Sequence, residues 1–267
     1  GHSDEILNRL GPEGKLFAFD QDIDAEKNVP SDPRITFIHS NFRFIRNFLR
    51  YYKIEKVDGI LADLGISSYQ IDNDQRGFTF MKNVALDIRM NKADTKKASD
   101  ILNKYPLDEL IRVFREYGDL NNARKVSESI ISARSERTFK TNNDLTCAID
   151  SFLPVKHPNK MLAKIFQALR IEVNDEIEAL KEMIIQTKDI LKTGGRLVVL
   201  TYHSAEDRIV KNFMRSGNIK GEIVKDFYGN VESEFRLINK SVVTASDREI
   251  TLNPRSRSAK LRIAEKI

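Results

Sequence analysis

The sequence is poor in cysteine and has no long apolar run. Cys147 is the only cysteine among 267 residues, so no internal disulfide can form, and this fits a reducing compartment. No uninterrupted apolar stretch approaches the roughly 20 residues that cross a bilayer, and no signal peptide is recognisable. We therefore expect a cytoplasmic protein with no membrane partner.

The sequence also lacks the spacing of a metal site. Its four histidines and single cysteine are scattered, whereas zinc ligands come in closely spaced pairs. We expect no metal. Repeats and low-complexity tracts are absent too. With 40% hydrophobic and 31% charged residues, the composition is that of a globular chain, long enough for one large domain or two small ones.

Positive charge exceeds negative charge only slightly, and the excess is unevenly placed. The net charge is +5, yet residues 253–267 hold five cations against Glu265 alone. The rest of the chain is therefore almost balanced. A charge run is most often a solvated face. The alternative is an element that contacts phosphates, and composition alone leaves both interpretations open.

Hydrophobic periodicity predicts alternating helices and strands. In the first part of the chain it predicts a helix capped by Ser3, strands over 15–19, 35–39 and 57–63, and a helix face over 45–52. In the last part it predicts a helix over 177–191 stopped by Gly194-Gly195, a strand over 196–202, a helix capped by Ser204 with Asp207 in the capping box, and a strand over 260–263. This order favours a parallel sheet covered by helices.

About 130 residues separate Gly65 from Arg196, far more than one parallel crossover needs. Helical stripes occur over 107–114 and 123–131, and Thr141 can cap a further helix. Strand signals are few there. We predict an α/β domain formed by residues 1–91 and 166–267, with an inserted helical domain over 92–165.

Candidate site residues follow from the predicted strand ends, because ligands of open parallel sheets bind at the carboxyl edge. Asp20 is either an acceptor for ribose hydroxyls or an ordinary turn acid, and this position does not separate a nicotinamide cofactor from S-adenosylmethionine. Asp63 could accept hydrogen bonds from an amine, or could cap the following turn. Ser67 and Ser68 are interpreted as capping or turn residues. His203 is predicted to be a cleft residue of unassigned role.

Seven sequence blocks in order carry a family resemblance. They are DGILADLGISS at 58–68, RGFTF at 76–80, LDIRM at 86–90, FQALRIEVN at 166–174, GGRL at 194–197, HSAEDRIVK at 203–211 and NPRSRSA at 253–259. Together they closely resemble the RsmH family, also called MraW, over essentially the whole chain.

The resemblance implies a class I, Rossmann-like methyltransferase sheet with an inserted helical substrate-recognition domain. The implied activity is S-adenosylmethionine-dependent N4-methylation of a cytidine in the decoding region of bacterial 16S rRNA. The implied partner is that rRNA within the small ribosomal subunit, and a homodimer is left open.

The resemblance also implies which residues form the site. The cofactor contacts fall on Gly1, His2, Asp20, Phe42, Asp63 and Gln70. Gly1-His2-Ser3 is similar to the end of the family's glycine-rich loop, so we expect the first strand to lie before residue 1. Two departures are Tyr69 and Ala205, where the family usually has proline and leucine.

For catalysis, we expect Asp63 or a nearby backbone carbonyl to accept a hydrogen bond from the cytosine amine, with His203 close to the flipped base. Phosphate contacts are predicted for Arg255, Arg257, Lys260 and Arg262. Two alternatives remain at this point. One is a nicotinamide-dependent oxidoreductase, although no complete Gly-x-Gly-x-x-Gly is present. The other is a non-enzymatic RNA-binding assembly factor with a vestigial cofactor site.

Overall fold

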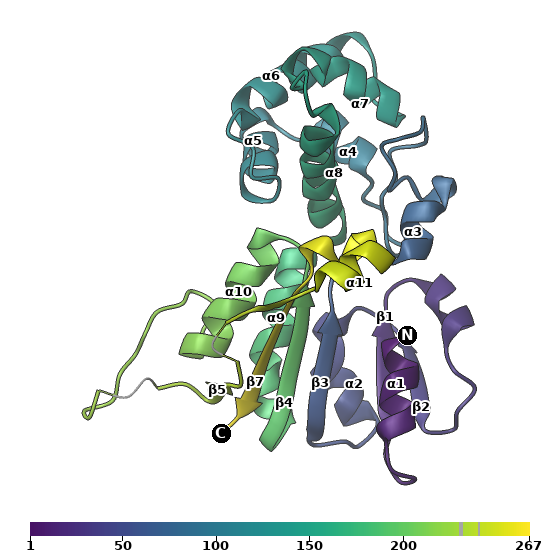
Figure 1. The fold of residues 1–267 in the computed structure, drawn as a ribbon. Helices are drawn as coiled ribbons and strands as arrows, with labels where there is room; N and C mark the ends of the chain where they lie inside the picture. The colour runs from purple at the N-terminus through teal and green to yellow at the C-terminus, as the bar shows by residue number, and fades with distance from the viewer. Residues whose placement is uncertain (230–231, 240) are drawn as a thin grey trace. The chain divides into compact units, whose positions relative to one another are not determined.

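The computed structural model describes residues 1–229, 232–239 and 241–267. The chain folds into two compact units. The sheet unit comprises Gly1–Gly65 and Ile177–Ile267, and the helical unit comprises Ile66–Glu176 (Figure 1). Within the described ranges, no helix combines the length and apolar character needed for a membrane span.

The sheet unit begins with a short helix and a parallel pair of strands. Helix α1 (His2–Arg9) leads into β1 (Leu16–Asp20), which pairs in parallel with β2 (Ile35–His39). The 3-10 turns η1 (Ile23–Asn28) and η2 (Phe42–Phe44) follow these strands, and α2 (Ile45–Tyr51) leads to β3. The predicted strands and the helix face are confirmed. The predicted Ser3 cap is wrong, because α1 starts at His2, two residues earlier than predicted, with Gly1 as its N-cap.

A second sheet has the strand order β3-β4-β7-β5, with β6 also paired to β7. Its strands are β3 (Val57–Asp63), β4 (Leu191–Thr201), β5 (Phe235–Leu237), β6 (Val243–Thr244) and β7 (Lys260–Lys266). Strands β3 and β4 are parallel, and β7 is antiparallel to β4. The associated helical elements are α9 (Glu176–Ile190), α10 (Ser204–Ser216), α11 (Asp247–Leu252) and η5 (Pro254–Ser258). The mixed α/β class is confirmed.

The predicted stop of the long helix at Gly194-Gly195 is wrong. Helix α9 ends at Ile190, and Leu191 already pairs with Val57 in the sheet. The glycines lie inside β4, next to a register shift between Val57 and Gly59. A side chain at Gly195 would meet the carbonyl oxygens of Lys192 and Asp58 at 2.8 and 3.0 Å. The glycine pair therefore permits an irregular strand rather than ending a helix.

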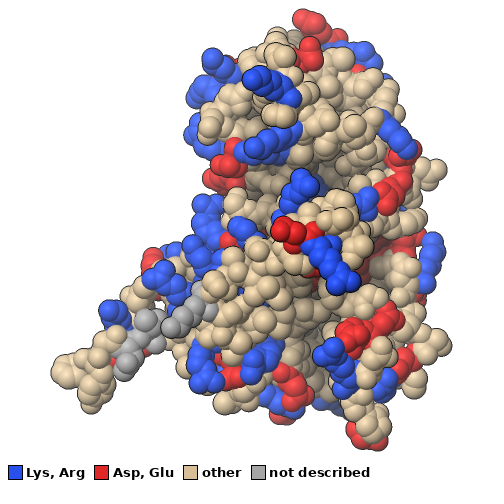
Figure 2. All heavy atoms as spheres, in the orientation of Figure 1, with Lys and Arg blue, Asp and Glu red and all other residues tan. Residues whose placement is uncertain are grey.

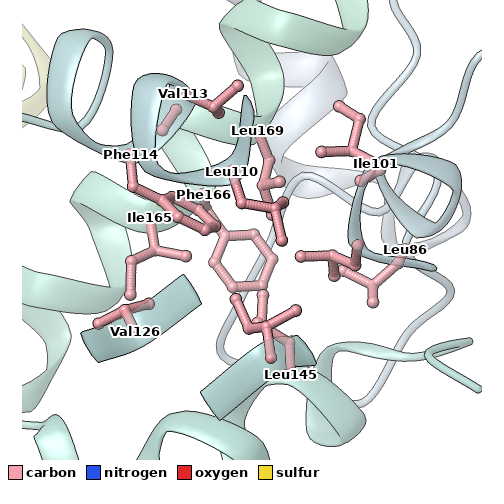
Figure 3. Packing of buried hydrophobic residues seen from close by; sticks show 14 of the residues in the cluster. Leu86, Ile101, Leu110, Val113, Phe114, Val126, Leu145, Ile165, Phe166 and Leu169 are labelled. Atoms are coloured by element: carbon pink, nitrogen blue, oxygen red, sulfur yellow. The ribbon is translucent and has the colours of Figure 1, made fainter. Parts of the chain in front are cut away.

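The helical unit is built from short helices around one core. Its elements are α3 (Ser68–Asp72), η3 (Asp74–Arg76), α4 (Ala98–Lys104), α5 (Leu107–Glu116), α6 (Ala123–Glu136), α7 (Asn142–Ile149), η4 (Asp150–Phe152) and α8 (Pro158–Asn174). The predicted Thr141 cap is confirmed, since Asp144 Oδ2 accepts from the Thr141 backbone N–H at 2.8 Å. Phe114, Leu110 and Ile165 have no exposed surface at the centre of this core (Figure 3).

The helical unit is wider than the predicted insert at 92–165. Leu86 and Ile88 belong to its core, each with 1% exposure, although they precede residue 92. On the other side, α8 continues to Asn174. The Asn174 amide donates to the Ile88 carbonyl at 2.9 Å and accepts from the Met90 N–H at 2.7 Å. These contacts fasten the segment before α4 to the end of α8.

Candidate active site

Asp63 and Tyr202 meet at the carboxyl end of two parallel strands. Asp63 ends β3 and pairs in register with Leu200 of β4, so Tyr202 leaves β4 just beyond it. The Tyr202 hydroxyl donates to Asp63 Oδ1 at 2.8 Å. Burial raises the pKa of Tyr202, and its hydrogen bond to Asp63 and the negative charge there raise it further. Tyr202 is therefore a protonated donor at neutral pH.

Asp63 keeps access to solvent and has a second neighbour. Its side chain is 41% exposed, and its Oδ2 lies 3.4 Å from Nδ1 of His2. Gly65 adopts a φ of +94°, and a Cβ there would contact the Tyr202 ring at 3.4 Å. The start of α1 and the ends of β3 and β4 thus converge on one carboxylate, which brings together the predicted residues His2 and Asp63.

Asp20 and Phe42 lie at the ends of the other parallel pair. Asp20 is the last residue of β1, and its Oδ1 accepts from the backbone N–H of Asp22 at 2.8 Å. Phe42 opens η2 directly after β2 and is partly buried. Asp20 thus acts as a turn acid, because one of its carboxylate oxygens accepts a backbone hydrogen bond from the following turn. Its ribose-binding role stays a prediction.

His203 serves as the N-cap of α10. Its Nδ1 accepts from the Glu206 backbone N–H at 3.4 Å, and its Nε2 lies 3.1 Å from Glu206 Oε1. Glu206 Oε2 accepts from the Tyr202 backbone N–H at 2.9 Å. The predicted Ser204 cap and Asp207 capping-box residue are therefore wrong by one position. The capping interactions belong to His203 and Glu206, because the helix already begins at Ser204.

The His203 side chain is only 6% exposed and the Glu206 side chain 3%. The pair therefore holds the loop that carries Tyr202. Sequence reasoning missed both Tyr202 and Glu206. Tyr202 is the last residue of the strand predicted over 196–202, but its contact with Asp63 depends on the register of β3 against β4. Glu206 sits three residues after His203, which is the capping-box spacing, so that signal was present.

Gln70 belongs to the helical unit and is 4% exposed. It forms a capping box with Ser67: its Oε1 accepts from the Ser67 N–H at 3.2 Å, and its N–H donates to the Ser67 hydroxyl at 3.2 Å. Ser67 is thus the predicted cap, and Ser68 is the first residue of α3. A cofactor contact by Gln70 stays a prediction.

The four cations predicted to contact phosphates have different surroundings. Arg255 and Arg257 are exposed in η5. In β7, Arg262 forms two hydrogen bonds to Asp207 at 2.7 and 3.1 Å, and Lys260 lies 3.4 Å from the same carboxylate. Burial alone would raise the pKa of Asp207, but these cations hold it below its ordinary value. Lys260 and Arg262 therefore share the Asp207 carboxylate as an internal partner.

In the part of the chain that the structure describes, no cluster of three or more His, Cys, Asp or Glu residues could hold a metal ion. The chemistry available at the strand ends is instead that of hydrogen-bond acceptors. Asp20 and Asp63 are carboxylates at the ends of β1 and β3. Such groups can receive hydroxyl and amine donors of a nucleoside-like ligand.

Comparison with known proteins decides among the three functional classes that the sequence left open. A sequence model of the MraW methylase family matches residues 1–267. The chain belongs to the MraW methylase family. This confirms the resemblance and the methyltransferase class, and it gives no support to a nicotinamide-dependent oxidoreductase or a non-enzymatic assembly factor.

Similar relatives carry one name, "Ribosomal RNA small subunit methyltransferase H". The protein of that name from Bacteroides thetaiotaomicron is 53% identical over 266 residues, covering 100% of this chain and 88% of the relative. The Parabacteroides distasonis protein is also 53% identical, with the same coverage. The Flavobacterium psychrophilum protein is 51% identical and 91% covered.

Proposed function

We propose that this protein transfers a methyl group from S-adenosylmethionine to N4 of a cytidine in the decoding region of 16S rRNA. The observation that carries the proposal is full-length membership of the methylase family, in a chain whose relatives are named as small-subunit rRNA methyltransferases. The partly exposed Asp63 carboxylate at the strand ends offers a place for the reaction. Because bacterial rRNA is cytoplasmic, we infer the same location for the protein.

The residues present fit S-adenosylmethionine. Its ribose hydroxyls and its amine are hydrogen-bond donors, and Asp20 and Asp63 supply carboxylate acceptors at the ends of neighbouring parallel pairs. We propose that Gly1, His2 and Phe42 complete this site on the sheet unit, and a cofactor contact by Gln70 stays a separate prediction. When bound, the cofactor supplies an electrophilic methyl group on a sulfonium.

Asp63 is proposed to accept a hydrogen bond from an amine at the reacting centre. The cytosine amine is a weak nucleophile because its lone pair is delocalised into the ring. A carboxylate acceptor helps to localise that pair and favours the charge that develops on nitrogen. Tyr202 donates to Oδ1 of Asp63, and His2 Nδ1 lies 3.4 Å from Oδ2, so a ligand amine would share Oδ2 with His2. Much of the rate enhancement then comes from positioning.

His203 is proposed to act near the base by holding the chain between β4 and α10, since its imidazole is engaged with Glu206. The target base must leave its stack to reach the site, and proteins usually read RNA in loops or single strands. Phosphate contacts by Arg255, Arg257, Lys260 and Arg262 would hold the flanking strand.

The proposal is tested by methyl transfer from labelled S-adenosylmethionine to 30S particles and to free 16S rRNA. We expect incorporation, and the comparison shows which of the two is the substrate. Asp63→Asn should lower kcat by about 100-fold at saturating cofactor, the usual scale for a positioned acid–base group. Asp58→Asn is the matched control, because Asp58 lies near the start of the same strand, β3, and its side chain is 87% exposed. Near-normal turnover by Asp63→Asn would show that Asp63 is not essential for methyl transfer.

A further inference from the structure

Helix α10 carries a row of cations that the site described above does not use. Arg208, Lys211 and Arg215 are all exposed. At 3.6 residues per turn, positions i, i+3 and i+7 fall within about 60° of one another around the helix axis. In the described part of the chain, no carboxylate pairs with any of these three. We call them the α10 ridge.

The opposite face of α10 is fixed in the sheet unit. Ile209, Val210, Phe213 and Met214 are buried, and Phe213 packs on Phe235 with ring centroids 5.3 Å apart. Gly217 closes the helix in the left-handed conformation. The ridge is therefore presented by a rigid element rather than by a loose tail, and its cations keep a fixed spacing.

Both acids of α10 are withdrawn from the exposed face. Glu206 is 2% exposed and accepts from the Tyr202 backbone N–H. Asp207 is held by Arg262 and Lys260 of β7. The exposed charge of the helix is thus wholly positive, although its sequence contains two carboxylates. Lys and Arg side chains gather on this side of the sheet unit, over and beside α10 (Figure 2).

The α10 ridge runs outward from the candidate active site. Helix α10 begins at Ser204, two residues after Tyr202 contacts Asp63. From Arg208 to Arg215 the ridge spans about 10 Å, at 1.5 Å per residue. The ridge therefore carries three cations over this length, which can neutralise up to three phosphates of one RNA strand.

We infer that the α10 ridge is a second contact surface for RNA, which holds the phosphates of the strand that leads away from the methylated base. This inference rests on the proposed function. It adds three residues to the expected RNA contacts and places them on a rigid helix. The ion pairs between Asp207 and β7 bring Lys260 and Arg262 beside the first turn of the same helix. The two sets of cations thus lie on one side of the sheet unit.

The test is the salt dependence of binding to a 16S rRNA transcript. The slope of log K against log[KCl] is negative. The triple variant Arg208→Gln, Lys211→Gln, Arg215→Gln should make it less steep by about 2, at about 0.7 per lost single-strand phosphate contact. Its affinity for S-adenosylhomocysteine should not change. The variant Arg208→Lys, Arg215→Lys retains the charges and should keep the slope.

A matched control removes the same charge elsewhere. Lys15, Arg50 and Lys56 are exposed near the starts of β1 and β3, away from the carboxyl strand ends, and the triple Gln variant should leave the slope nearly unchanged. An unchanged slope for the ridge variant would overturn the inference, as would an equal effect of the control. A loss of 30S binding with normal transcript binding would also overturn it, by assigning the ridge to a ribosomal protein.

Failure of the inference is distinguishable from failure of the proposed function. If the unaltered protein methylates 16S rRNA while the ridge variant keeps its salt slope, only the ridge is wrong. If the unaltered protein methylates neither transcript nor 30S particles, the proposed function itself is wrong.

Discussion

Removing the Tyr202 hydroxyl should weaken the reaction through Asp63. The hydroxyl donates to a carboxylate at 2.8 Å, and hydrogen bonds to charged groups contribute about 1.5–3 kcal/mol. Water can replace part of this bond, because the Asp63 side chain is 41% exposed. We therefore expect Tyr202→Phe to cost about 1–1.4 kcal/mol, which is a five- to tenfold fall in kcat/KM for methylation of 16S rRNA. The phenyl ring still fills the space beside Gly65.

The decisive assay is a double-mutant cycle with Asp63→Asn. If Tyr202 acts by orienting Asp63, Tyr202→Phe should cost much less in the Asp63→Asn background, since contacting residues are non-additive. Tyr51→Phe is the matched control: Tyr51 is 77% exposed, and its loss of a hydroxyl should leave kcat/KM unchanged. Equal effects of Tyr202→Phe in both backgrounds would refute the positioning role.

Four other outcomes follow from the same structure. Asp20→Ala should weaken S-adenosylhomocysteine binding in titration calorimetry, and an unchanged Kd would discredit the ribose assignment. Replacing the two η5 arginines with glutamine should make the negative salt slope of RNA binding less steep by about 1.4, and an unchanged slope would rule out phosphate contacts by these two residues. Phe114→Ala should lower the free energy of unfolding in urea by about 3–5 kcal/mol, because Phe114 has no exposed surface, while Phe227→Ala, at 97% exposure, should change it by less than about 0.5 kcal/mol. Arg262 and Lys260 hold the pKa of Asp207 below its ordinary value. The ion pairs therefore stabilise the fold above about pH 4, the ordinary pKa of an aspartate, and this stabilisation is lost as the pH falls through the lower pKa that Asp207 has in the folded protein. Asp207→Asn should therefore destabilise the protein at pH 7, and the difference from the unaltered protein should shrink as the pH is lowered through the native pKa of Asp207, whereas a difference that does not change with pH would contradict the ion pair.

Periodicity and strand-end residues predicted much of the fold. Strands β2 and β3 begin and end where the apolar runs do, and Asp20 and Asp63 lie at strand ends as expected. The predictions that were wrong concern the ends of helices. Ser204 looked like a cap because serine is a common N-cap, but the helix starts one residue earlier, so that His203 and Glu206 take the capping positions.

The rest depended on tertiary contacts that a single sequence does not display. Tyr202 became a site residue only through the register of β4 against β3. The segment around Leu86 and Ile88 has no strong periodicity of its own, and it joins the helical core through Asn174, which is 84 residues away from Met90. Likewise, the free cations of α10 could be recognised only after Glu206 and Asp207 were seen to face inward.

The proposed activity is methylation of a cytidine of 16S rRNA at N4. The most direct measurement is mass-spectrometric mapping of the methyl group after incubation with methyl-labelled S-adenosylmethionine and 30S particles that lack this modification. We predict one labelled cytidine in the decoding region, with the methyl group on N4. Labelling of another base or atom, or no transfer to particles or to free rRNA, would show that the protein does not have this activity.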